Sequence, residues 1–86
     1  MRLEDIFVRI REFFINSFEL YVNPKLIPEK IDLDFNVGKD LTWNSRFLID
    51  FLGQIENCFG VDIDEYYRKN SFALGAICEK VYKYAK

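Results

Sequence analysis

The sequence contains no histidine and only two cysteines, Cys58 and Cys78, among its 86 residues. Without histidine, the chain cannot build a Ser-His or Cys-His nucleophile or a Cys/His zinc site. Two cysteines on or beside apolar positions do not make a disulfide framework, so we expect them to be reduced and unreactive thiols. These absences argue against most metal sites and most hydrolases, and we expect a protein that is not an enzyme and binds no metal ion.

The sequence also lacks an excess of positive charge. It has 12 Lys and Arg residues against 14 Asp and Glu residues, which gives a net charge of −2. Nucleic-acid-binding domains carry a basic patch, so this balance argues against nucleic acid as a partner. Asp62, Asp64 and Glu65 lie close together, but the glycine and terminal glutamate of an EF-hand loop are missing, and we interpret them as a solvated turn.

Long apolar runs are missing as well. The N-terminal residues lead into an amphipathic pattern rather than a signal peptide, and no run approaches the roughly 20 residues that span a bilayer. Half of the residues are nonetheless hydrophobic and 17% are aromatic, which suits one modest folded core. We expect a single domain over residues 1–86 that is cytoplasmic, not inserted in a membrane, and monomeric.

Three stretches have apolar residues at the spacings of a buried helix face. The first covers residues 3–21, and Asn23-Pro24 ends it. The second follows Ser45, which stands in the N-cap position, and ends near Gly60, a residue that suits a left-handed helix end. The third follows Asn70 or Ser71 as its cap. The apolar faces consist of Leu3, Ile6, Phe7, Ile10, Phe14, Phe18 and Tyr21, then Leu48, Phe51, Leu52, Ile55 and Phe59, then Leu74, Ile77, Cys78, Val81 and Ala85.

The connections complete the expected architecture. Residues 22–44 form a long first loop that we expect to lie on the core through apolar anchors. Asp64 is placed to cap a brief helix that ends at Arg68. The pattern predicts an all-α domain with three long helices, one short helix and a long first loop.

The residues around Ser45 follow a known motif. Asp40-Leu41-Thr42-Trp43-Asn44-Ser45 precedes an amphipathic helix, and Glu56, Phe59 and Ile63 come 11, 14 and 18 positions after Ser45. This spacing resembles the acyl carrier proteins, and the resemblance covers nearly all of the chain. The chain differs from the family's Asp-Ser-Leu motif in having Asn44 before the serine and Arg46 after it.

The resemblance implies an acyl-carrier-protein-like four-helix bundle with a covalent cofactor. Ser45 would receive 4′-phosphopantetheine from coenzyme A through a phosphopantetheinyl transferase. The thiol of that arm would carry an acyl or aminoacyl group as a thioester. Further partners would be acyl- or aminoacyl-transferring enzymes and synthases of lipid (fatty acid) or specialised-metabolite synthesis. A helix N-terminus also stabilises an attached phosphate, although an isolated serine there would be only a cap.

We predict that these enzymes bind the surface around Ser45. The second helix is poor in carboxylates, so attraction to basic partners should be weaker than in typical family members. The two apolar residues of this surface, Phe47 and Ile49, could instead pack under the loop. The predicted partner surface consists of Asn44, Arg46, Phe47, Ile49, Asp50 and Glu56.

Other interpretations stay open at this point. The aromatic residues Phe7, Phe14, Phe18, Phe51 and Phe59 could line a cavity for an acyl chain or fill the core. We favour a core position for Trp43. An alternative function is an acyl-carrier-like protein-interaction module that is not phosphopantetheinylated, and a third is an unrelated helical bundle.

Overall fold

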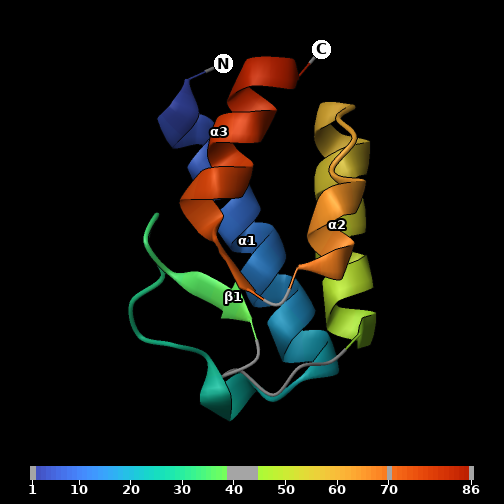
Figure 1. The fold of residues 1–86 in the computed structure, drawn as a ribbon. Helices are drawn as coiled ribbons and strands as arrows, with labels where there is room; N and C mark the ends of the chain where they lie inside the picture. Colours follow the sequence, from blue (N-terminus) through green and yellow to red (C-terminus); the bar gives the residue numbers. More distant parts are fainter. Residues whose placement is uncertain (1, 39–44, 70, 86) are drawn as a thin grey trace.

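The computed structural model describes residues 2–38, 45–69 and 71–85 (Figure 1). Along the chain the elements are α1 (Leu3–Tyr21), the 3₁₀ helix η1 (Pro24–Leu26), β1 (Asn36–Gly38), α2 (Ser45–Phe59), the 3₁₀ helix η3 (Asp64–Arg68), β2 (Ser71–Ala73) and α3 (Leu74–Tyr84). The described part is thus mostly helical, with three α-helices and a small two-stranded sheet. The four-helix bundle is not confirmed, because a five-residue 3₁₀ helix stands where the short helix was expected.

Helix α1 has the bounds that the apolar spacing predicts. Glu4 and Asp5 lie in its first turn, where the helix dipole favours carboxylates. At its end the N–H of Val22 donates to the carbonyl of Phe18, and the Asn23 side chain then accepts from the Lys25 N–H to start η1. In Figure 1, α1 runs antiparallel to α2 and α3, so that it starts at the end of the molecule where α3 finishes.

Helix α2 ends at Phe59, directly before a glycine in the left-handed conformation. Gly60 has a φ of +65°, and its N–H donates to the carbonyl of Glu56 at 2.8 Å. A side chain on this backbone conformation is unfavourable, so glycine suits the position. The predicted end near Gly60 is confirmed.

The two-stranded sheet was not expected from the sequence. Strands β1 and β2 pair antiparallel, with Asn36 opposite Ala73, Val37 opposite Phe72 and Gly38 opposite Ser71. Ser71 is therefore a strand residue and does not cap α3, while Asn70 lies outside the described residues. The residue in the N-cap position of α3 is Ala73, whose side chain forms no capping hydrogen bond.

The long connection, rather than a capping side chain, provides the hydrogen-bond acceptors for the first amides of α3. The N–H groups of Leu74 and Gly75, at the start of α3, donate to the carbonyls of Phe35 and Leu33, each at 2.9 Å. These amides have no partner within the helix, so the connection satisfies them instead. The expectation that the loop lies on the core is confirmed at Ile31 and Val37, which are buried.

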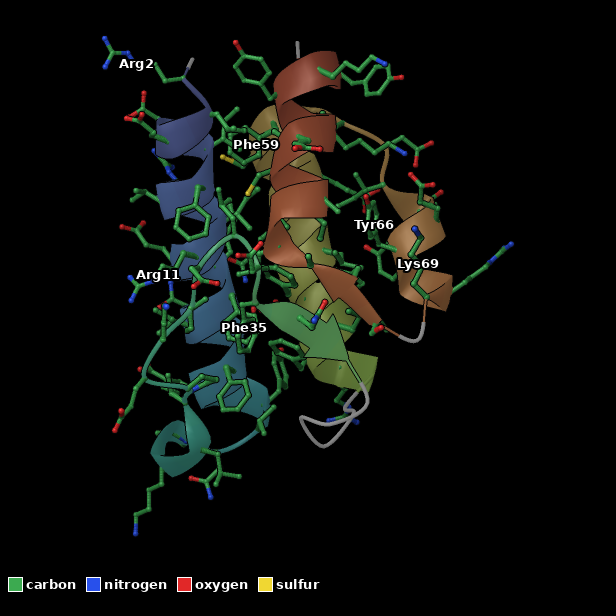
Figure 2. The ribbon with its side chains drawn as sticks, turned by 60° about the vertical axis from the view of Figure 1, so that its left-hand side comes forward. Arg2, Arg11, Phe35, Phe59, Tyr66 and Lys69 are labelled. Carbon is green, nitrogen blue, oxygen red and sulfur yellow. The ribbon has the colours of Figure 1, made fainter. Side chains whose placement is uncertain are left out.

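The core forms where α2 and α3 pack against α1. At its centre the Phe14 ring lies 5.4–5.6 Å from the rings of Phe18, Phe35, Phe47 and Phe51. Figure 2 shows Phe35 directed inward, whereas Arg11 points away from the bundle. The aromatic residues thus contact one another and fill this part of the core. Phe14, Phe18, Phe51 and nine aliphatic side chains are the largest that are fully buried.

The side of the core beside η3 is closed by Tyr66. Its ring packs edge-on against Phe72 at 5.1 Å, and the Lys69 ammonium lies 5.0 Å from its centre (Figure 2). Lys80 of α3 forms an ion pair with Glu65 of η3. Among the described residues, no helix combines the length and apolar character required to cross a bilayer.

Replacing Gly75 with alanine should destabilise the fold by about 1–2 kcal/mol, because the new Cβ would lie 2.9 Å from the backbone oxygen of Leu33. Gly53→Ala is the matched control, since it is also helical but its Cβ meets nothing within 4 Å. That substitution should stabilise the protein by about 0.5–1 kcal/mol through helix propensity. Urea denaturation of both variants measures the difference, and equal effects would contradict the close approach of the loop to α3.

Candidate functional site

The candidate site is the start of α2, where Ser45 is the first helical residue. The sequence placed Ser45 at the N-cap just before this helix, whereas the helix includes Ser45 and so starts one position earlier than expected. Asn44 and Trp43 lie outside the described residues. The first turn of α2 contains no acidic residue. A phosphate group at this position would therefore meet the positive end of the helix dipole without a neighbouring carboxylate in that turn.

Two residues of the predicted partner surface are exposed beside this helix start. Arg46 is exposed, and the Ile49 side chain has an exposed fraction of 59%. Together with Tyr21 and Asp50 they line a surface pocket of about 340 Å³. An apolar side chain and a cation thus lie within about one helical turn of Ser45.

Phe47 does not belong to that surface. Its side chain is only 5% exposed, and its ring stacks on Phe51 and meets Phe14 and Phe18 edge-on. The prediction that Phe47 faces a partner is wrong: it is buried, and its ring contacts come from α1 and α2 rather than from the loop that the alternative named. The physical reason is that the buried face of α2 includes Phe47 in addition to the residues that the apolar spacing predicted.

Asp50 holds α2 to α1 rather than standing free. Its Oδ2 accepts from the Ser17 hydroxyl at 2.6 Å and from the Gln54 amide at 2.7 Å. Gln54 also donates to the Ser17 hydroxyl at 3.0 Å. Since Ser17 is fully buried, this carboxylate satisfies a polar group that would otherwise destabilise the interface.

Glu56 is engaged in the same way at the other end of α2. Its Oε1 accepts from the Tyr67 hydroxyl at 2.9 Å, and its Oε2 accepts from the Ile63 N–H at 3.2 Å. Burial raises the pKa of Tyr67 to about 12, and the hydrogen bond to Glu56 contributes to the same shift. Glu56 therefore fixes the turn and η3 against α2. The sequence identified Glu56 by its spacing but gave no sign of its partner Tyr67.

A cluster of three carboxylates follows from this arrangement. One oxygen each of Glu56, Asp62 and Asp64 lies within 4.8 Å of the others. Both Glu56 oxygens already accept hydrogen bonds, and an Asp62 oxygen accepts from the Asp64 N–H at 3.0 Å. The N-cap position of η3 is occupied by Ile63, so Asp64 begins that helix instead of capping it. The cluster organises a turn, and nothing else in the described residues points to a bound cation.

The two cysteines occupy different environments. Cys78 is buried in α3, and burial raises the pKa of its thiol to about 11. It is therefore a core residue that stays protonated at neutral pH. Cys58 is exposed on α2, beside the buried Phe59, so of the two cysteines only Cys78 is a core residue.

Comparison with known proteins adds no family assignment. No protein-family model matches the chain, and neither a curated protein nor a solved structure matches it.

Replacing Glu56 with alanine should destabilise the protein by about 1–3 kcal/mol, because the Ile63 N–H and the Tyr67 hydroxyl both lose their acceptor. Glu56→Gln keeps one acceptor oxygen, so it should lower the stability less than Glu56→Ala does. Asn57→Ala, on the exposed neighbour in the same helix, serves as the control and should change stability by less than about 0.5 kcal/mol. Equal stability of the alanine variant and the parent in urea denaturation would refute the role of this carboxylate.

Asp64 should make the protein less stable at neutral pH than in mild acid. The charge of Asp62 raises the pKa of Asp64 above 3.8, so the folded state binds its proton more tightly than the unfolded state. This contribution to stability is complete below pH 3.8 and is lost as the pH rises through the folded-state pKa.

The variant Asp64→Asn should accordingly raise the melting temperature at pH 7, and the gain should shrink as the pH approaches 4. Thermal denaturation across this pH range measures both effects. Glu29→Gln removes the same charge from an exposed loop position and should not show the pattern. A gain that stays constant with pH would contradict the repulsion between Asp62 and Asp64.

Proposed function

We propose that this protein is an acyl-carrier-like protein that holds an acyl or aminoacyl group as a thioester on 4′-phosphopantetheine attached to Ser45. The observation that carries the proposal is the position of Ser45 as the first residue of α2. A serine at a helix start is open to a modifying enzyme, and a phosphate attached there is stabilised by free backbone N–H groups.

The residues that carry the family resemblance also have structural roles here. Phe59 and Ile63 are buried, and Glu56 holds the turn between them through the Ile63 N–H. Gly60 takes the left-handed conformation that ends α2. This agreement supports the resemblance, because these four described motif residues all contribute to the end of α2 and the turn that follows it.

The chemistry of attachment requires little from the protein itself. The Ser45 hydroxyl would form an ester bond to the phosphorus of coenzyme A that bears the pantetheine, and the bond to the nucleotide phosphate would break. A base of the phosphopantetheinyl transferase would accept the hydroxyl proton. The bound arm supplies a thiol for thioester chemistry, while α2 supplies a fixed attachment point and the Arg46 and Ile49 side chains for enzyme recognition.

The alternative, an interaction module without the arm, is favoured by a separate observation. Asp50 and Glu56 are the only two carboxylates of α2, and both accept hydrogen bonds within the protein, so α2 offers basic enzymes few unoccupied acceptor groups. Exposed Ile49 would then contact one protein partner through apolar burial. Such a module would have no role as a carrier in fatty-acid or other lipid synthesis, because it would hold no acyl group.

Intact mass spectrometry distinguishes the two functions. Incubation with coenzyme A and a broad-specificity phosphopantetheinyl transferase should add one phosphopantetheine group to the parent protein. Ser45→Ala should gain nothing while staying folded, because alanine is well tolerated at the first residue of a helix.

The matched control is Ser71→Ala, on an exposed serine of β2, which should be modified like the parent. If the parent gains no mass, and protein isolated from its native cells is also unmodified, the carrier proposal fails. The interaction module then becomes the function to pursue.

A further inference from the structure

A surface pocket lies between the end of α1 and the start of α2, and its lining includes the residue that follows Ser45. The two helix ends lie at the same end of the molecule in Figure 1. The hydrogen bond from Ser17 to Asp50, at 2.6 Å, fixes how these antiparallel helices lie against each other. Tyr21 comes one turn after Ser17, and Arg46 comes one turn before Asp50, so Tyr21 and Arg46 are level with each other. A defined helix contact therefore holds the pocket in place.

Along α2 the lining of this pocket changes from a cation to an apolar side chain. Arg46 and Ile49 are both exposed, and they line the pocket of about 340 Å³ together with Tyr21 and Asp50. An exposed isoleucine gains free energy when an apolar group covers it, and a guanidinium pairs well with a phosphate. The pocket therefore suits a ligand in which an anionic group is followed by an apolar group.

We propose that this pocket binds the first part of the 4′-phosphopantetheine arm, with Arg46 at the phosphate and Ile49 at the dimethyl-substituted carbon that follows it. The inference rests on the proposed function, because that function supplies the occupant. The arm would begin at Ser45, directly before Arg46, with an anionic phosphodiester. A carbon with two methyl substituents comes next along the arm, before its hydroxyl and its two amides. Charge and apolar surface thus follow in the same order in the arm and in the pocket.

The charges at the start of α2 favour the phosphate at the Arg46 end of the pocket. A guanidinium has five N–H donors, so Arg46 can hold a phosphate while it contacts a protein group. The first backbone N–H groups of α2 and the helix dipole act in the same direction. Asp50 opposes an anion, but it lies a full turn further along, and its Oδ2 accepts hydrogen bonds from Ser17 and Gln54.

Covalent attachment makes a contact of this size sufficient. A group on a short flexible linker has an effective concentration on the order of millimolar, so a site that binds the free arm weakly is still substantially filled. The thioester end of the arm stays outside, because the pocket lies within about one helical turn of Ser45. Before modification, the same side chains remain open to the modifying enzyme.

Two-dimensional NMR of the modified protein tests this arrangement. A nuclear Overhauser effect should join the methyl groups of the arm to the Ile49 side chain. Attachment of the arm should also raise the melting temperature of the parent by about 2–4 °C, because apolar surface becomes buried. Mass spectrometry verifies that each sample carries one arm.

Variants separate the apolar half of the pocket from its charged half. Ile49→Ser should abolish both the Overhauser contact and the rise in melting temperature. Arg46→Gln should reduce that rise by about half, and Arg46→Lys, which keeps the charge, should retain more of it than Arg46→Gln does. Val8→Ser removes an exposed apolar side chain from the first half of α1 and is the matched control that should behave like the parent.

Titration of the unmodified chain with free 4′-phosphopantetheine tests the pocket without the covalent bond. The Ile49 methyl resonances should shift between about 0.1 and 10 mM, and they should shift less in Arg46→Gln. Inorganic phosphate over the same range should leave the Ile49 resonances unchanged, because it has no apolar part.

The two experiments distinguish this inference from the proposed function. If the arm attaches to Ser45 but contacts Ile49 in neither experiment, the pocket assignment is overturned while the carrier function stands. If the chain is never modified but the free arm shifts Ile49, the pocket assignment stands and attachment to Ser45 fails. A chain that is neither modified nor able to bind the free arm overturns both. Equal shifts in the parent and in Arg46→Gln would refute the contact of Arg46 with the phosphate.

Discussion

The structure depends on the packing of aromatic rings around Phe14. The neighbours of this ring come from α1, from the long connection and from α2, so one side chain joins segments that are distant in sequence. Edge-to-face contacts at these distances add to the free energy of burial. Because α1 contacts both other helices, loss of this centre would separate α2 from α1 and remove the support on which the connection rests.

Within this apolar frame, the few polar groups at helix contacts are paired with one another. Asp50 joins α2 to the buried Ser17 of α1, and Glu56 joins α2 to Tyr67 and to the turn before η3. No buried side-chain nitrogen or oxygen among the described residues lacks a partner. The polar contacts therefore fix the relative position of helices whose apolar faces alone would allow some sliding.

The helices could be predicted from the sequence because their signals are local. The bounds of α1 follow from apolar spacing and from Asn23-Pro24, and the end of α2 follows from Gly60. The strands could not be predicted, since three residues are too few to show an alternating pattern, and β1 in the middle of the chain pairs with β2 near its end. Phe47, Asp50 and Glu56 were also assigned to a surface, although their partners lie within the protein itself. Their partners Phe14, Ser17 and Tyr67 are close in space but not in sequence, and local spacing does not identify such contacts.

The hydrogen bonds from Leu74 and Gly75 to the long connection have a consequence for how the chain opens. The N–H groups of Leu74 and Gly75 have these partners only while residues 33–35 are docked, so these two segments form one cooperative unit. Such a unit joins the two halves of the chain and closes a large loop, which carries an entropic cost that local helix formation does not. Release of the connection would thus fray the start of α3 and unzip β1 from β2 in the same event, while α1 and α2 could remain associated.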